Sequence, residues 1–172
     1  MDLNALNDLS YGLYVVSVPG GQGGFGGCIV DALMQATSDE PPVLLLSSIK
    51  RNFTNQALRE TGEFAVSVLP KAVDPLVIAQ FGFQSSKNVD KWADVKHDMF
   101  LGLPVLPGCT VIRGRVTEQK ELSTHTLFTC TTLDVVKGKG LEPLTYAFYR
   151  NELKNEVFAA FKAYKAQKAG QA

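Results

Sequence analysis

Hydrophobic residues follow a strand-like pattern over most of the chain, either alternating with polar residues or running together in short stretches. These stretches are rich in Val, Ile, Leu, Phe and Thr and are separated by Gly, Pro and Ser, which is typical of β-strands joined by turns. Strands are therefore predicted at residues 11–18, 28–37, 43–49, 64–69, 109–122, 125–137 and 143–150. Because strands and helices do not alternate as they do around a parallel sheet, we expect a mainly β fold, a closed or nearly closed barrel with helical insertions and a C-terminal helix.

Helical periodicity is confined to four segments, at residues 2–9, 53–60, 75–81 and 152–168. Asn52 favours the start of a helix and Gly62 favours its end. The last segment is predicted either to cap the barrel or to dock on a partner subunit, because apolar residues recur on one face. These residues are Val157, Phe158, Phe161 and Tyr164.

The strand at residues 28–37 is predicted to have one polar and one apolar face, because side chains alternate along a strand. Asp31, Gln35 and Thr37 flank Leu33 on one side, which suits a flat heteroaromatic ligand with polar edges. The opposite side is expected to be core: Cys28, Val30, Ala32, Met34 and Ala36. The prolines at 41–42 fix the turn that follows, and residues 43–46 are apolar on both faces, as in a fully covered strand.

A group of polar and basic residues follows this second strand and leads into a helix: Ser47, Ser48, Lys50, Arg51, Asn52 and Thr54. Helix N-termini bind anions through free N–H groups and the positive end of the helix dipole. The segment is thus either a phosphate site or an ordinary basic turn before a capped helix, and it lacks the glycine spacing of a Walker loop. A later loop offers Ser85 and Lys87 as a second anion contact, or is a solvated connector with Trp92 in the core.

Six glycines lie between residues 19 and 27. A dinucleotide fingerprint needs a glycine turn that opens a helix, whereas the residues that follow look like a strand. A flexible hairpin between two antiparallel strands is the better interpretation, and its mobility is predicted to let a substrate approach the neighbouring site.

Composition excludes several classes of function. The chain of 172 residues, 45% hydrophobic, fits a single domain over residues 1–172. Lys plus Arg equals Asp plus Glu at 17 each, so neither nucleic acid nor a membrane is an expected partner. The start of the chain does not resemble a secretory signal, and three scattered cysteines and two distant histidines give no metal-ligand set. A cytoplasmic location is expected, with Cys28, Cys109 and Cys130 as reduced, mostly buried thiols.

Seven segments occur in a recognisable order, starting from the Tyr11-Gly-Leu-Tyr-Val-Val-Ser run. The others are Gln35-Ala-Thr37 with Pro41-Pro42, Lys50-Arg-Asn52-Phe-Thr54, Gly62-Glu-Phe-Ala-Val-Ser-Val-Leu69, Phe81-Gly-Phe-Gln-Ser85 with Asp90-Lys91, Thr124-His125-Thr126-Leu-Phe and Pro143-Leu-Thr-Tyr146-Ala-Phe-Tyr149. Together they resemble the flavin reductase-like proteins, which are FMN-binding split barrels, and most of all the flavoredoxins and the flavin domain of rubredoxin reductases. The resemblance runs from the first helix to about Arg150.

This resemblance implies a homodimer of six-stranded barrels with FMN near the subunit interface. Gln35 and Thr37 would line the flavin ring, with His125 at the ring edge and Tyr146 near its open face. The phosphate and ribityl chain would be held by Ser48, Lys50, Asn52 and Thr54, and Ser85 and Lys87 would close on the phosphate side.

Three residues depart from the family's pattern. Asp31 stands where relatives commonly carry Asn, and a carboxylate near the flavin would disfavour a negatively charged reduced ring. Ser86 replaces a glycine and Lys87 an arginine, so the phosphate contact would be a point charge rather than a fork.

Three functions remain open from the sequence. In the first, NAD(P)H reduces bound FMN, which passes electrons to free flavin, rubredoxin or a similar acceptor; the cofactor carries this chemistry. His125 is then the candidate catalytic residue, polarising the ring or binding the nicotinamide, although a histidine at the start of a strand is more often structural. The alternatives are a non-enzymatic FMN electron carrier reduced by a redox protein, and a ligand binder without turnover.

Overall fold

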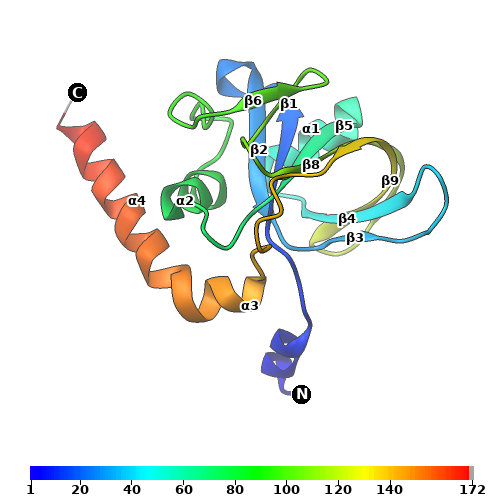
Figure 1. The fold of residues 1–172 in the computed structure, drawn as a ribbon, viewed down its shortest axis with the longest axis horizontal. Coiled ribbons are helices and arrows are strands. Elements are labelled where there is room, and N and C mark those ends of the chain that lie inside the picture. Colours follow the sequence, from blue (N-terminus) through cyan, green and yellow to red (C-terminus); the bar gives the residue numbers. More distant parts are fainter. Residues whose placement is uncertain (171–172) are drawn as a thin grey trace.

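The computed structural model describes residues 1–170, and within them a curled antiparallel sheet of seven strands forms the body of the molecule (Figure 1). The strands lie in the order β2-β1-β5-β8-β9-β4-β3. Their bounds are β1 Tyr14–Pro19, β2 Phe25–Val30, β3 Leu33–Gln35, β4 Val43–Ile49, β5 Glu63–Val68, β8 Thr110–Glu121 and β9 His125–Val136. The predicted barrel-like β fold is confirmed.

Hairpins produce most of this sheet. β1 and β2 pair through the glycine-rich turn, with Val16 opposite Cys28, and β8 and β9 form a long hairpin interrupted by two register shifts. β4 then pairs with β9, which places Leu46 opposite Phe128. A separate small hairpin, β6 Asp98–Phe100 and β7 Leu103–Val105, precedes β8.

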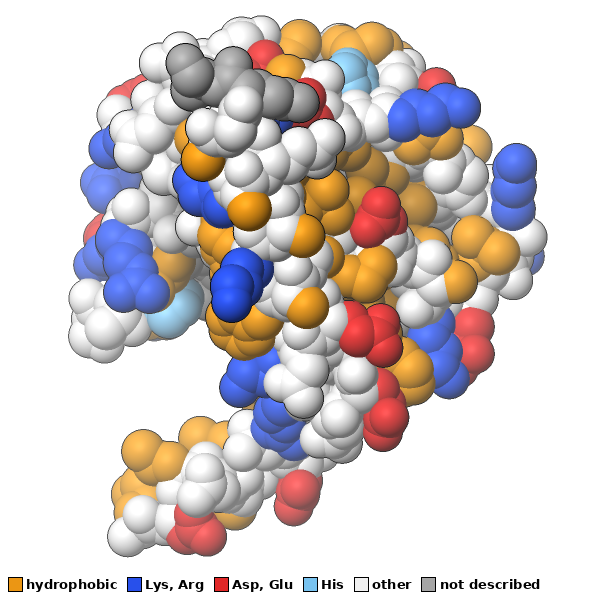
Figure 2. All heavy atoms as spheres, turned by 90° about the vertical axis from the view of Figure 1, so that its left-hand side faces the viewer, with side chains coloured by type: hydrophobic (Ala, Val, Ile, Leu, Met, Phe, Trp, Pro, Cys, Tyr) orange, Lys and Arg blue, Asp and Glu red, His pale blue; other side chains and the backbone are white. Residues whose placement is uncertain are grey.

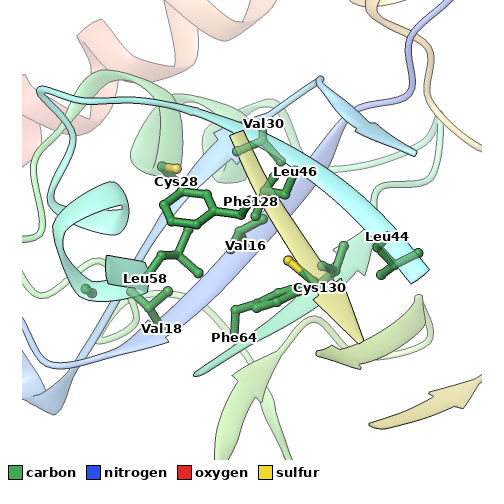
Figure 3. Packing of buried hydrophobic residues seen from close by; sticks show 12 residues of the cluster. Val16, Val18, Cys28, Val30, Leu44, Leu46, Leu58, Phe64, Phe128 and Cys130 are labelled. Carbon is green, nitrogen blue, oxygen red and sulfur yellow. The ribbon is translucent and has the colours of Figure 1, made fainter. Parts of the chain in front are cut away.

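The curled sheet encloses a core formed by alternate residues of its strands. Phe64 and Phe128 are fully buried. The Phe128 ring lies towards α1 Phe53–Thr61, and the Phe64 ring lies beside Cys130 in the same cluster (Figure 3). Burial of side chains this large contributes about 2 kcal/mol each, so this cluster holds the strands in their curled arrangement.

Helices cover one side and one end of the sheet. α1 starts after Asn52 and ends at Gly62, which has a left-handed φ of 69°. α2 Pro75–Phe83 packs between the sheet and the long C-terminal helix α4 Lys154–Ala169 (Figure 1). Phe83 stacks on Phe158, with ring centroids 5.0 Å apart. Within residues 1–170 no helix is both long enough and apolar enough to cross a membrane.

The short 3₁₀ helix Leu3–Asp8 stands away from the body at the N-terminal end (Figures 1 and 2). Its leucines Leu3, Leu6 and Leu9 are all more than half exposed. The segment is helical as predicted, but its apolar side faces solvent in the single chain.

The expected strand at residues 28–37 is broken into two. β2 ends at Val30 and β3 begins at Leu33, after which the chain pairs with β4 instead of β1. The break reverses the predicted faces: Leu33 packs against the core, whereas Met34 is 59% exposed. The prediction that Met34 and Ala36 belong to the core was therefore wrong, because alternation carries a face assignment only as far as the strand is continuous.

Two further strand predictions are corrected by the structure. Residues 143–150 were expected to form a last strand, but Thr145 Oγ1 accepts a hydrogen bond from the Phe148 N–H at 3.2 Å and starts the short helix α3 Tyr146–Phe148. A π-helical turn, Tyr149–Leu153, then leads into α4. β4 is buried on one face only, with Leu45 half-exposed on the other, so it is not a fully covered strand in this chain.

Arg113 is a charged residue of β8, yet only 8% of it is accessible. Its guanidinium donates to the carbonyl oxygens of Phe64 and Gly114, both at 2.8 Å, and pairs with Glu63. Glu63 also accepts from Arg115 Nε at 2.8 Å. Burial opposes ionisation of Glu63, but the bonds from Arg115 and Arg113 outweigh it and hold the pKa of that carboxyl below its usual range. The pair thus joins β5 to β8.

Replacing Glu63 with Gln is expected to lower the free energy of unfolding by about 2 kcal/mol at neutral pH, because a largely buried guanidinium loses its counter-charge. Since the folded-state pKa of Glu63 is depressed, its contribution is present above the unfolded pKa and is lost as the pH falls through the folded one. Urea unfolding from about pH 7 to about pH 3 should show the two curves converging in acid. Glu118→Gln, an exposed change on the same hairpin, is the control and should change stability little. A constant difference at every pH would contradict this role for the carboxylate.

Candidate functional site

A hollow of about 230 Å³ lies where the N-terminus of α1 meets the glycine hairpin and the loop that follows α2. Its wall therefore comes from three segments that are distant in sequence. The lining residues are Gly27, Cys28, Ile29, Arg51, Asn52, Phe53, Thr54, Phe81, Gly82, Gln84, Ser85, Ser86 and Lys91.

Lys91 is the buried cation of this hollow, with 2% of its surface exposed. Its Nζ donates to the carbonyl oxygens of Gly27 at 2.8 Å and Phe81 at 3.1 Å, and so joins the hairpin to α2. Burial lowers the pKa of Lys91 to about 8. At neutral pH the amine is therefore mostly charged, and two of its three N–H groups are occupied.

Ser86 holds the glycine hairpin against the same loop. The Gly27 N–H donates to Ser86 Oγ at 3.1 Å, and the Gln22 N–H donates to the Ser86 carbonyl oxygen at 2.9 Å. Trp92 Nε1 donates to the Gly26 carbonyl oxygen at 3.2 Å from beneath. The predicted hairpin is confirmed, and these bonds anchor it to the wall of the hollow.

The N-terminus of α1 forms the opposite side of the hollow. Asn52 precedes the helix, but among the described residues its side chain makes no bond to the first helical N–H groups. The Asn55 N–H donates to the Asn52 carbonyl oxygen at 3.1 Å, and the Phe53 and Thr54 N–H groups remain available to a ligand. Arg51 is exposed at the rim and Thr54 is buried. Burial raises the pKa of the Cys28 thiol, although side-chain bonds from Thr54 and Asn52 partly offset the effect, so the thiol is neutral.

Two polar groups near this site have no partner within residues 1–170. Gln84 Nε2 is buried in the wall of the hollow, and Ser48 Oγ is buried on β4 just before α1. A buried donor without a partner costs about 1–3 kcal/mol. Together with Lys91, Arg51 and the helix N-terminus, Gln84 makes a donor set that suits a phosphate and an attached polyol, whereas the predicted Ser48 does not line the hollow.

The structure brings together part of the predicted site. Asn52, Thr54 and Ser85 line the hollow. Lys50 does not, because its Nζ pairs with Glu121 Oε2 at 2.8 Å on the other side of the turn, and the neighbouring Arg51 takes its place. Lys87 lies on the loop that closes the hollow, where its carbonyl oxygen accepts from Gln22 Nε2 at 3.3 Å.

The residues predicted to surround the ring lie outside this hollow. Gln35 Nε2 donates to the Thr37 carbonyl oxygen at 2.7 Å, and Thr37 Oγ1 accepts from the Val43 N–H at 3.0 Å, so both residues shape the turn between β3 and β4. Asp31 is half-buried at the break between β2 and β3. His125 starts β9, with Nδ1 2.8 Å from Thr124 Oγ1. Tyr146 lies near Tyr149 and packs against a second cluster of buried residues, which includes Leu69 and Leu144. Their roles remain predictions.

Lining residues that the sequence did not single out include Gly27, Cys28, Phe53 and Phe81. The sequence analysis noted Lys91 only as part of the Asp90-Lys91 segment, and Ser86 only as the replacement of a glycine. The signal for Lys91 was its place between Asp90 and Trp92: Asp90 Oδ1 accepts from the Trp92 N–H at 3.0 Å, which fixes the turn and directs the lysine inward.

Comparison with known proteins gives a family. The flavin reductase like domain matches residues 6–155. The chain is 34% identical over 152 residues to the high molecular weight rubredoxin of Moorella thermoacetica, covering 87% of this chain and 66% of that protein, just under two thirds. It is also 34% identical over 152 residues to the ferric-chelate reductase (NAD(P)H) of Archaeoglobus fulgidus, covering 87% and 89%.

Solved structures have the same fold. The NADH:FAD oxidoreductase of Streptomyces globisporus aligns with a TM-score of 0.74 at 22% identity, covering 82% of this chain and 84% of that one. An FMN-binding protein from Thermus thermophilus aligns with a TM-score of 0.68 at 21% identity, covering 77% and 75%. Because the family match covers residues 6–155, most of the chain, the chain belongs to the flavin reductase like domain family.

Proposed function

We propose that this protein is a flavin-dependent oxidoreductase in which NAD(P)H reduces a bound FMN and the flavin passes the electrons to free flavin, rubredoxin or a similar acceptor. This proposal rests on the hollow at the N-terminus of α1, in which a buried lysine, free helical N–H groups and two serines lie together. Such a donor set is suited to a terminal phosphate. The names of the two curated relatives, a rubredoxin and an NAD(P)H-dependent reductase, support the same chemistry.

The residues present fit the phosphate end of FMN. The unpartnered Gln84 Nε2 and the N-terminus of α1 supply neutral donors, and Lys91 and Arg51 supply charge. Since the hollow, at about 230 Å³, is smaller than the roughly 300 Å³ at which pockets begin to enclose whole ligands, it would hold the phosphate and part of the ribityl chain. The ring would then lie outside it, towards the β3–β4 turn with Gln35 and Thr37.

We propose that a second copy of the chain shields the flavin ring from solvent. The outer face of β3, β4 and β9 carries apolar side chains among polar ones: Met34 lies opposite Leu45, and Leu133 is 44% exposed. Exposed apolar faces of this kind mark protein contacts. A homodimer through this face would bury β4 on both sides, as its sequence predicts. Light scattering of the purified protein should give twice the chain mass.

In the proposed reaction the flavin supplies the hydride-accepting chemistry. The chain's part is to bind and orient: Lys91 and Arg51 hold the phosphate, Asn52 and Thr54 hold the chain next to it, and Phe53 shields that end from water. Orientation of this type supplies much of the rate of a hydride transfer between stacked rings. Within residues 1–170 no group of three metal-ligating side chains occurs.

Anaerobic stopped-flow spectroscopy of the FMN-loaded protein tests the proposal. Mixing with one equivalent of NADH or NADPH should bleach the flavin absorbance, and an excess of oxidised rubredoxin or free FMN should then reoxidise the bound flavin. FAD and riboflavin should be compared as cofactors, with FMN expected to bind most tightly because only FMN ends in the phosphate that the hollow suits.

Failure to bleach with both nicotinamides, while a reduced redox protein does bleach the flavin, would contradict the enzyme and favour the electron carrier. A protein that takes up no flavin would contradict both.

A further inference from the structure

A second hollow, of about 310 Å³, lies on the opposite side of α2 from the first. Its walls come from α2, from the turn after β5 and from the segment between β7 and β8, and they are mostly apolar. They include Val73, Leu76, Val77, Leu106, Pro107 and Cys109. Figure 2 shows hydrophobic side chains gathered in a depression beside α4, the helix that runs down from the grey terminal residues.

Gln80 is the unusual residue of this hollow. It lies on α2, lines the cavity together with Val77, and is only 1% exposed. Within the described part of the chain neither its amide nitrogen nor its amide oxygen has a hydrogen-bond partner. Buried polar side chains almost always find partners, so Gln80 leaves one donor and one acceptor unpaired beside the cavity.

The rim of the hollow carries charge that is already partly neutralised. Asp94 accepts from Tyr164 Oη and pairs with Lys168 Nζ, each at 2.9 Å, which fastens α4 beside the opening. Asp74 caps α2 by accepting from the Leu76 N–H at 2.8 Å. Lys96 is the remaining charged lining residue. The two rim carboxylates disfavour an anionic ligand, and burial raises the pKa of Cys109 so that its thiol adds no charge.

We propose that this hollow is a second binding site, for a small and mostly apolar molecule that carries an uncharged primary or cyclic amide. Two amides can form a pair of hydrogen bonds, because each offers an N–H donor next to a carbonyl acceptor. The Gln80 side chain has both groups. The apolar walls take up the rest of the ligand. The volume of the hollow matches the lower end of small-molecule sites.

The site is separate from the flavin hollow but shares a helix with it. Phe81 and Gly82 of α2 line the first hollow, and Leu76, Val77 and Gln80 line the second. The proposal does not depend on the flavin chemistry, since no residue lines both cavities.

The test is a titration of isotope-labelled protein with benzamide, followed through the side-chain amide signals by NMR. The Gln80 signals, assigned by their loss in Gln80→Met, should shift saturably with a Kd on the order of 1 mM or below. Toluene, which lacks the amide, and benzoate, which is charged, should bind at least about 10-fold more weakly. Nicotinamide should also bind more weakly than benzamide because its ring is more polar. This comparison distinguishes two possible natural ligands, an apolar amide and the nicotinamide group of NAD(P)H.

Gln80→Met preserves side-chain volume and should weaken benzamide binding about 10-fold while leaving FMN affinity unchanged. Gln56→Met, an exposed change on α1, is the matched control and should leave benzamide binding unchanged. Val77→Phe fills the cavity and should also abolish benzamide binding. This variant tests the proposal if Gln80→Met does not fold. Absence of a saturable shift in the parent protein, or equal binding to the parent and to Gln80→Met, would overturn the proposal.

Discussion

Replacing Lys91 with Met is expected to weaken FMN binding roughly 30-fold and to lower the free energy of unfolding by about 2 kcal/mol. The first effect follows because a charge-assisted bond to phosphate is worth about 1.5–3 kcal/mol. The second follows because the Gly27 and Phe81 carbonyl oxygens lose their shared donor in the interior. Equilibrium dialysis with FMN and urea unfolding measure the two effects independently.

The pH dependence of the parent protein provides a sharper test of the same residue. The pKa of Lys91 is lowered to about 8, below that of the unfolded chain, so between these two values the unfolded state binds more protons. Stability should therefore rise with pH over that interval. FMN affinity should fall over the same interval, because the amine loses its charge. Both trends should be absent in Lys91→Met.

Lys162→Met is the matched control, because Lys162 is exposed on α4 and distant in sequence from every lining segment. It should bind FMN and unfold like the parent. If Lys91→Met retained FMN affinity with an unchanged pH profile, the lysine would be a structural tie and not a phosphate ligand.

Replacing Gly27 with Val should destabilise the protein by about 3 kcal/mol and abolish flavin uptake. A Cβ at Gly27 would lie 2.7 Å from the Val16 carbonyl oxygen, which belongs to the neighbouring strand and cannot move without breaking the sheet. The Phe81 ring would be 3.2 Å away on the other side. Overpacking between rigid groups typically costs 1–3 kcal/mol, and the bonds from Ser86 and Lys91 to Gly27 would be strained as well.

Gly82→Ala is the matched control for stability, since a Cβ there would meet Ile29 Cγ1 at an ordinary 3.7 Å. Near the end of α2 the alanine should stabilise the helix by up to about 1 kcal/mol. Thermal unfolding of both variants and absorbance of the purified proteins give the answer. A flavin-loaded Gly27→Val protein would show that the close approach of the two strands is not needed for the hollow.

Features encoded within a few residues could be predicted from the sequence. The start of α1 at Phe53, its end at Gly62 and the β8–β9 hairpin depend on local propensity and turn chemistry. The face of β3 could not be predicted, because the break after Val30 changes the strand's partner, and pairing partners are set by the whole sheet. The helix at 146–148 was missed because an aromatic-rich run has high β propensity, while capping by Thr145 favours the helix.

Part of the candidate site could be predicted for the same reason. Asn52 and Thr54 belong to one helix start, and its chemistry can be read from consecutive residues. Lys91 could not be assigned a role, because a lysine in a polar loop is usually solvated and its burial depends on carbonyl groups from Gly27 and Phe81. Lys50 and Arg51 are adjacent and chemically alike, and only the position of Glu121 on β8 decides which one pairs across the sheet.

The buried indole of Trp92 gives the protein a built-in optical reporter. It is the only tryptophan of the sequence, and its ring packs edge-on against Phe81, with centroids 4.6 Å apart. Phe81 in turn lines the first hollow. Flavins absorb light in the range in which tryptophan emits, so energy transfer should quench the emission whenever a flavin is bound at the proposed site. Occupancy can then be followed in real time without a label, even with cofactor analogues that emit no light themselves.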